Sequence, residues 1–169
     1  MFVLGIDPGV TRCGYAVVHQ DGRATKAKAI GVLTTSRDDP LARRLADLQA
    51  DLRALIVEFS PYVVAIERVL FSSNTSTAMS VGQASGIAMA EAAVAGCEVI
   101  EYSPNQVKEA VAGHGGASKK QVQEMVQILL GLDTVPNPPD AADAAAIALC
   151  HLAMAPLHAA AARAESGTR

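Results

Sequence analysis

The amino-acid sequence predicts an α/β protein built on a mixed five-stranded sheet with helices on both faces. Short apolar runs that end in turn residues predict the strands, and stretches with helical periodicity alternate with the later ones. The 169 residues suit one domain with a full-sized hydrophobic core. Half of the residues are hydrophobic and 18% are charged, as expected for a compact globular chain.

The first half of the chain predicts three strands, a helix and a fourth strand. The strands over 2–7, 14–19 and 24–34 are separated by tight turns, which predicts an antiparallel meander. A stripe of leucines predicts a helix over 39–59. Because that helix precedes it, the strand predicted over 62–67 should run parallel to a neighbour in the sheet.

The second half of the chain predicts one more strand and four helices. Ser103 and Ser118 are predicted N-caps. The expected elements are a helix over 75–95, a strand over 98–102, helices over 104–112 and 119–130, and a last helix from Asn137-Pro138-Pro139 to about 164. We expect one domain over 1–158 and a frayed tail over 159–169.

The helix over 75–95 has an unusual composition. Between Arg68 and Glu91 the chain carries no charged residue, and small or apolar residues occupy all sides of the predicted helix. A helix of this kind is buried, either in the core of its own domain or against a partner chain. In so small a domain we favour a homodimer interface.

Charge and cysteine content limit the classes of function and location. The net charge of −3 is unusual for a nucleic-acid enzyme, and six aromatic residues without tryptophan argue against a base-stacking platform. No signal peptide or membrane-spanning run is apparent. The three scattered cysteines show no metal-binding spacing. We therefore expect a cytoplasmic protein with reduced thiols and no membrane association.

Four acidic residues form the pattern that indicates a function. Asp7 and Glu67 close apolar strands, and Asp140 and Asp143 lie one turn apart on the last helix. Such carboxylates can converge on one point, and carboxylates that converge without basic partners repel one another. They therefore call for a divalent cation, which would also reverse the local sign of the charge. The pattern favours a magnesium-dependent phosphodiesterase.

Two of these carboxylates also have an ordinary structural explanation. Asp7 belongs to an Asp-Pro-Gly turn, and Asp140 can stabilise the N-terminus of its helix. Glu67 and Asp143 have no such explanation, because both occupy apolar surroundings in which an unpaired carboxylate is costly. Lysines at 108, 119 and 120 suit either a solvated surface or phosphate contacts, as does Arg12.

Five segments of the sequence together resemble the RuvC family of bacterial Holliday-junction resolvases. The resemblance is collinear from Met1 to about residue 155, and its segments are GIDPGVTRCGYAVV, AIERVLFSSNTSTAMSVGQASG, YSPNQVKEAVAG, ASKKQVQEMV and PPDAADAAAIA. It implies an RNase H-like fold and a homodimer that nicks two strands of a four-way DNA junction symmetrically. It also implies partnership with the branch-migration proteins RuvA and RuvB.

The resemblance also assigns roles to residues. The four metal-binding carboxylates of the family correspond to the four acidic residues above, which would hold two Mg²⁺ ions, or Mn²⁺, for two-metal hydrolysis. Family lysines near the scissile phosphate correspond to Lys108 and Lys119. An aromatic wedge corresponds to Leu70, with Phe71 next to it, and either could serve. The remaining candidate DNA contacts are Arg12, Arg68 and Lys120.

Three other functions remain open on the sequence. GIDPGVT also looks like a phosphate loop of the sugar kinase, actin and Hsp70 group, but 169 residues cannot supply the two domains that close around ATP. A junction-binding dimer that does not cut is a second alternative. A nuclease of the same fold that cuts RNA–DNA hybrids is the nearest alternative.

Overall fold

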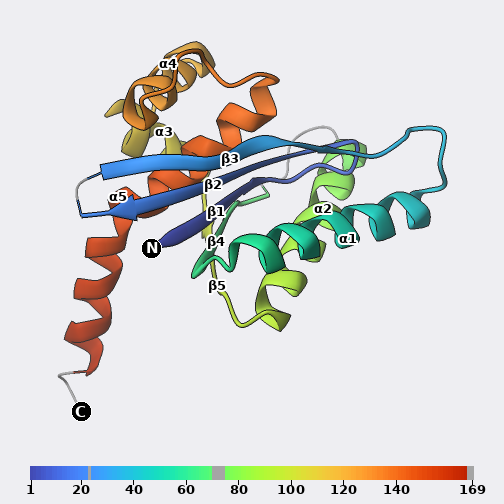
Figure 1. Cartoon of the computed structure of the whole chain (residues 1–169), viewed down its shortest axis with the longest axis horizontal. Helices are drawn as coiled ribbons and strands as arrows, with labels where there is room; N and C mark the ends of the chain where they lie inside the picture. The colour runs from blue at the N-terminus through green and yellow to red at the C-terminus, as the bar shows by residue number, and fades with distance from the viewer. Residues whose placement is uncertain (23, 70–74, 167–169) are drawn as a thin grey trace.

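The computed structural model describes residues 1–22, 24–69 and 75–166, with no side-chain detail for residues 75–77 and 157–166. Within those residues the chain forms a five-stranded sheet and five helices (Figure 1). The strands are β1 (Phe2–Asp7), β2 (Arg12–Asp21), β3 (Ala24–Thr34), β4 (Val63–Glu67) and β5 (Glu98–Tyr102). The helices are α1 (Leu41–Phe59), α2 (Thr75–Val94), α3 (Pro104–Ala112), α4 (Lys119–Leu130) and α5 (Pro139–Ser166).

The order of the strands across the sheet is β3-β2-β1-β4-β5. β1, β2 and β3 form the expected antiparallel meander, whereas β4 runs parallel to both β1 and β5. The predicted mixed sheet is therefore confirmed. The parallel pair β1 and β4 ends at the same edge of the sheet, where Asp7 and Glu67 lie.

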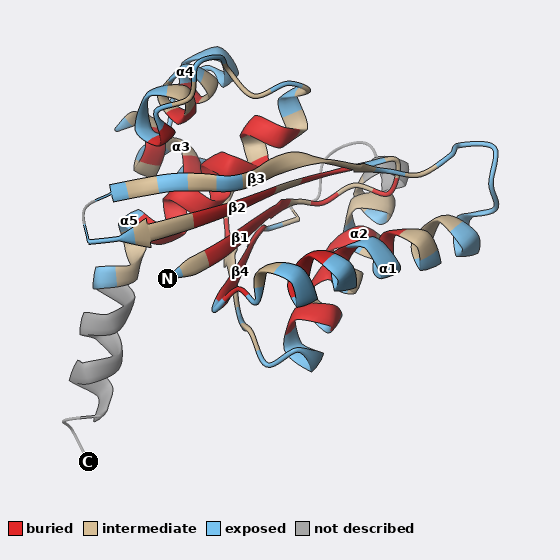
Figure 2. Cartoon of the chain, viewed as in Figure 1, coloured by how far each residue is buried: buried red, intermediate tan, exposed pale blue. Residues whose placement is uncertain are grey.

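Helices cover both faces of the sheet, as predicted. α1 and α2 lie on one face, and α3, α4 and α5 lie on the other (Figure 1). Each face has its own cluster of buried apolar side chains. Buried positions line both faces of the central strands and the helix sides that meet them (Figure 2). The core therefore consists of two layers with the sheet between them.

The two faces of the sheet differ in the size of their side chains. Because successive residues of a strand point to opposite faces, Leu4 and Ile6 of β1 face α1 and α2, whereas Val3 and Gly5 face α5. β4 repeats this arrangement, with Ala65 on the α5 side. Small residues on that side let α5 lie close to the sheet.

Most predicted boundaries agree with the structure. β2 begins at Arg12, two residues before the predicted start, because it pairs with the full length of β3. Ser103 and Ser118 cap α3 and α4, and each takes part in a capping box. α5 is helical to Ser166 and so continues into the segment predicted as a frayed tail. The division at residue 158 stays a prediction.

Helix α2 is only partly enclosed within one chain. Ala84, Ala88 and Ala92 are buried against α1 and the sheet, so one side of α2 belongs to the core. On the other side Met79 is 68% exposed, and Gly86 and Ala90 are also exposed. One side of α2 therefore belongs to the core, and a partner interface on its exposed side stays a prediction.

Candidate metal centre

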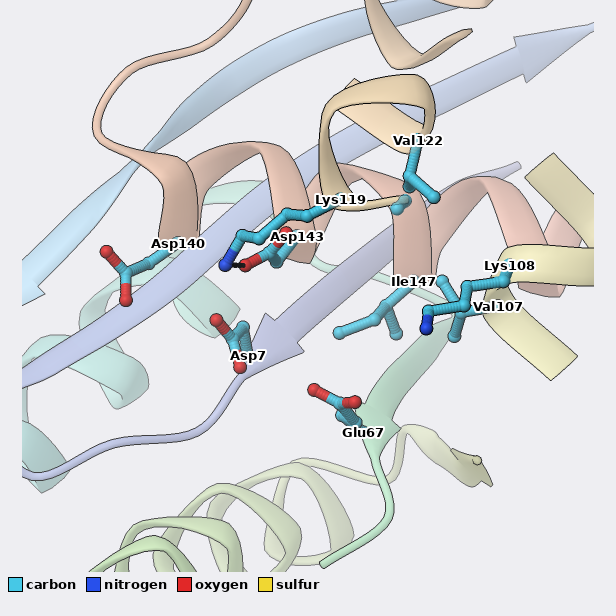
Figure 3. A pocket seen from close by; sticks show the side chains of 10 residues that line it. Asp7, Glu67, Val107, Lys108, Lys119, Val122, Asp140, Asp143 and Ile147 are labelled. Atoms are coloured by element: carbon cyan, nitrogen blue, oxygen red, sulfur yellow. Dashed lines mark ion pairs between the residues drawn. The ribbon is translucent and has the colours of Figure 1, made fainter. Parts of the chain in front are cut away.

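The four acidic residues line one cavity at the edge of the sheet. Asp7 and Glu67 extend from the ends of β1 and β4, and Asp140 and Asp143 extend from the first turns of α5 (Figure 3). The cavity has a volume of about 410 Å³. Its other lining residues are Val107, Lys108, Lys119, Val122, Ala146 and Ile147.

Strand alternation explains why Asp7 and Glu67 point toward α5. Asp7 follows Val3 and Gly5 at two-residue intervals, and Glu67 stands in the same relation to Ala65. All of these positions belong to the α5 side of the sheet. This two-residue pattern was available in the sequence and would have identified the face that carries the site.

Two glycines let α5 approach closely enough to complete the site. A Cβ atom added at Gly5 would overlap the backbone carbonyl of Ala144, and one added at Gly14 would overlap the carbonyl of Asp140. Ala144 and Ala148 occupy the side of the helix that faces Gly5. The roles of Gly5 and Gly14 are not evident in the sequence, because only the three-dimensional contact shows which residue each one meets.

Burial and mutual repulsion disfavour the charges of these carboxylates. Burial, followed by the nearby charges of Glu67, Asp143 and Asp140, raises the pKa of Asp7 from 3.8 to about 8. The pKa values of Glu67 and Asp143 are also raised, in both cases mainly by burial. A cation bound among these groups would offset the repulsion.

Two basic side chains contact the aspartates of α5, contrary to the expectation that the carboxylates converge without basic partners. Lys119 Nζ lies 2.5 Å from Asp143 Oδ2, and Arg12 Nη2 lies 2.6 Å from Asp140 Oδ2. That expectation was wrong because Arg12 at the start of β2 and Lys119 at the start of α4 both reach the aspartates of α5 in the folded chain. Asp7 and Glu67 remain the more deeply placed pair.

The donor chemistry of the site fits a divalent cation, although the side chains do not form a closed coordination shell. Carboxylate oxygens are the ligands that Mg²⁺ and Mn²⁺ prefer. Within the described parts of the chain, no group of three or more His, Cys, Asp or Glu side chains already has the spacing to hold an ion. Water or substrate oxygens would complete the shell of an ion held by these carboxylates.

The structure separates the candidate DNA contacts into two groups. Lys108 and Lys119 lie in the cavity with the carboxylates, and Arg12 lies at its edge on Asp140. Lys120 instead points away, toward Glu124 on its own helix at 3.7 Å, and Arg68 is exposed beside Glu67. The two candidate wedge residues, Leu70 and Phe71, lie outside the described residues.

Comparison with known proteins identifies relatives along nearly the whole chain. The family model described as crossover junction endodeoxyribonuclease RuvC matches residues 3–151. The crossover junction endodeoxyribonuclease RuvC of Natranaerobius thermophilus is 48% identical over 151 residues, which cover 89% of this chain and 94% of that protein. The matched region contains all four carboxylates and both cavity lysines.

Solved structures of one organism share the fold. The Thermus thermophilus RuvC structure is 38% identical, with a TM-score of 0.87 over 94% of this chain and 97% of that one. A second T. thermophilus RuvC structure, in complex with a Holliday junction substrate, is 36% identical, with a TM-score of 0.85 over 93% and 96%. These matches confirm the predicted RNase H-like fold. Within the described residues, no helix is long and apolar enough to cross a lipid bilayer.

Proposed function

This chain belongs to the RuvC family of crossover junction endodeoxyribonucleases, and on that premise we propose that it resolves four-way DNA junctions by metal-dependent, symmetric nicking. The observation that carries the proposal is the cavity in which carboxylates from β1, β4 and α5 converge. The Holliday junction substrate in the complex of the T. thermophilus relative supports the choice of DNA. A DNA substrate and three free cysteines also favour a cytoplasmic location of the protein.

Each charged side chain of the cavity has a role in the proposed hydrolysis. Asp7, Glu67, Asp140 and Asp143 would hold two Mg²⁺ ions, or Mn²⁺, which would supply water activation and neutralise charge at the phosphate and the leaving oxygen. The raised pKa values of Asp7 and Glu67 support this role, because burial disfavours the charge of each carboxylate and a bound cation would offset that cost. Asp140 and Asp143 add the third and fourth donors from one helix.

The basic residues would exchange one anionic partner for another. Lys119 forms an ion pair with Asp143, and Arg12 forms one with Asp140, so both positive charges lie beside carboxylates of the cavity. A phosphodiester there would accept hydrogen bonds from Lys119 and Lys108, which opposes the charge that develops during hydrolysis. Arg12, Arg68 and Lys120 would bind phosphates further along the DNA.

A homodimer would match the symmetry of a four-way junction. The exposed, uncharged side of α2, which includes Gly86 and Ala90, supports pairing of two chains through this helix. The wedge, at Leu70 or Phe71, would insert at the junction centre. Cooperation with RuvA and RuvB is proposed on family membership alone.

The test is cleavage of a synthetic four-way junction beside a linear duplex and an RNA–DNA hybrid, with Mg²⁺ and then with EDTA. We expect paired nicks in the junction with Mg²⁺ and intact DNA with EDTA. Cutting of the hybrid alone would reassign the substrate. Tight junction binding without cuts in Mg²⁺ and Mn²⁺ would show a binding module instead of a nuclease.

Replacing Asp7 by Asn should separate binding from cleavage. The substitution keeps the shape but removes a ligand charge, so we expect cleavage to fall by several decades, on the order of 10³-fold or more, with junction binding retained. Asp47→Asn is the matched control, because Asp47 is a partly exposed acid that pairs with Arg43 on α1, away from the cavity. Near-normal cleavage by Asp7→Asn would rule out the metal-site assignment.

A further inference from the structure

Tyr102 and His151 form a buried polar pair on the α5 side of the sheet. Tyr102 Oη lies 2.9 Å from His151 Nδ1, and the rings meet edge to face with centroids 6.1 Å apart. Tyr102 is 1% exposed and His151 is 3% exposed. A hydrogen bond between buried groups is costly to break, since water cannot replace either partner. The bond therefore restricts how α5 lies against β5.

Tyr102 also pairs with the end of β4 at which Glu67 lies. It is the register partner of Glu67 in the parallel β4–β5 pair. Its backbone carbonyl accepts a hydrogen bond of 2.8 Å from the amide of Arg68, the residue after Glu67. A displacement of Tyr102 would consequently move the backbone that carries the Glu67 carboxylate.

His151 belongs to the same ridge of α5 as an acidic residue of the cavity. Asp143, Ile147 and His151 follow at intervals of four residues, and Ile147 lines the cavity together with Asp143. His151 lies about 12 Å along the helix axis from Asp143, as eight residues of α-helix require. A rigid helix transmits a shift at one end to the other over this distance.

The two sides of α5 are held by different kinds of contact. Toward β1 and β2 the helix rests on Gly5 and Gly14, where backbone meets backbone. Toward β5 the Tyr102 side chain meets His151 at hydrogen-bond distance. Van der Waals contact limits only the closest approach of two elements, whereas a hydrogen bond also limits their separation.

We propose that Tyr102 and His151 are positioning residues whose hydrogen bond sets the spacing between Glu67 on β4 and Asp143 on α5. This inference rests on the proposed metal-dependent function of the same cavity. Neither side chain lines that cavity, so both act on the carboxylates through the elements that carry them. Loss of the bond should weaken cation binding more than it weakens junction binding.

The first test is Tyr102→Phe, which removes the hydroxyl group and retains the ring. Mn²⁺ binding to the free protein is measured by calorimetry, and junction cleavage is measured as a function of Mg²⁺ concentration. We expect the half-saturating concentration of each ion to rise about tenfold, as for other residues that orient metal ligands. Junction affinity in EDTA should not change, and excess Mg²⁺ should restore most of the cleavage rate.

The control is Val126→Ala, a cavity-forming change at a fully buried residue of the same core cluster. It should lower the thermal midpoint without changing Mn²⁺ affinity. Equal losses of Mn²⁺ affinity in Val126→Ala and Tyr102→Phe would overturn the proposal, since the pair would then act only through general stability.

His151→Asn and His151→Leu provide a second comparison if Tyr102→Phe does not fold. Asn keeps a polar atom near the position of Nδ1, whereas Leu does not, so Mn²⁺ affinity should be higher in the Asn variant. Equal affinities would overturn the proposal. Mn²⁺ calorimetry keeps this result separate from the proposed function: wild-type protein that binds Mn²⁺ without cutting the junction would refute the activity and leave the positioning role open to measurement.

Discussion

At the scale of single residues, Asp7 has the largest pKa shift among the carboxylates of the cavity. Burial and three neighbouring carboxylates raise its pKa to about 8. Asp7 therefore destabilises the fold when it is ionised, and a bound cation would offset that penalty. A cost of this kind in the native state is common at functional sites, where activity and stability make opposing demands.

The pH dependence of stability should show this penalty. Because folding raises the pKa of Asp7 from 3.8 to about 8, protonated Asp7 contributes stability that is complete below pH about 4 and is lost as the pH rises through 8. In EDTA, the thermal midpoint of wild-type protein should fall between pH 5 and 9, as measured by circular dichroism. The thermal midpoint of Asp7→Asn should fall less over this pH range, whereas that of Asp47→Asn should fall as much as that of the wild type.

The three cysteines should react with a thiol reagent in two classes. Cys13 and Cys150 are buried, and burial raises the pKa of each thiol to about 12. Cys97 is only half-buried, although burial also raises its pKa. Because the thiolate is the reactive form, we expect Cys97 to react first and the other two only after unfolding. Fast labelling of Cys150 in native protein would contradict the packing of α5.

At the scale of elements, the placement of α5 depends on two strand positions that have no side chain, Gly5 and Gly14. Its first turns carry Asp140 and Asp143, and they reach the sheet because Gly5 and Gly14 have no side chain at the points of contact. Alternation along β1 assigns Gly5 and Asp7 to the same face. One strand therefore supplies both a carboxylate and the space that brings its partners close.

Gly5→Ala should consequently impair both stability and the site. The added methyl group would overlap the carbonyl of Ala144 and force α5 away from β1. We expect a loss of about 1–3 kcal/mol in the free energy of unfolding, measured with denaturant, and weaker Mn²⁺ binding. Gly115→Ala is a suitable control, because an added Cβ there meets nothing within 4 Å. Unchanged stability of Gly5→Ala would contradict the close approach of α5.

At the scale of the whole molecule, a single chain leaves exposed the surface of α2 that the proposed homodimer would cover. One side of α2 completes the core through Ala84, Ala88 and Ala92, and the opposite side presents Gly86 and Ala90 without charge. A soluble helix that is apolar on its outer side is unusual unless another surface covers it. The dimer thus remains a prediction with a defined surface.

Ala90→Glu should test that surface directly. A buried, unpaired carboxylate opposes association, so we expect a monomer by analytical ultracentrifugation and loss of paired nicking, with Mn²⁺ binding retained. Val57→Glu is the matched control, since Val57 is 73% exposed on α1. If the wild type is monomeric at the concentrations that cleave junctions, the dimer proposal fails.

Much of the fold and of the candidate site could be predicted from the sequence. Strand alternation, the leucine stripe of α1 and the Ser caps of α3 and α4 are local signals, and the structure confirms the elements that they predict. Asp7, Glu67 and Asp143 were identifiable because a carboxylate at the end or on the face of an apolar segment needs a partner. The predicted elements are confirmed because they depend on neighbours within one or two turns of chain, whereas the metal-binding role of the acidic residues stays a prediction.

The sequence by itself determined the order of the elements, the mixed character of the sheet and the acidic residues of the site. Only the tertiary structure decided that Lys119 and Arg12 contact Asp143 and Asp140, that Gly5 and Gly14 admit α5, and that Tyr102 bonds His151. Each of these contacts joins segments that are far apart along the chain. Their partners are selected by how helices pack on the sheet, and no local pattern of residues contains that information.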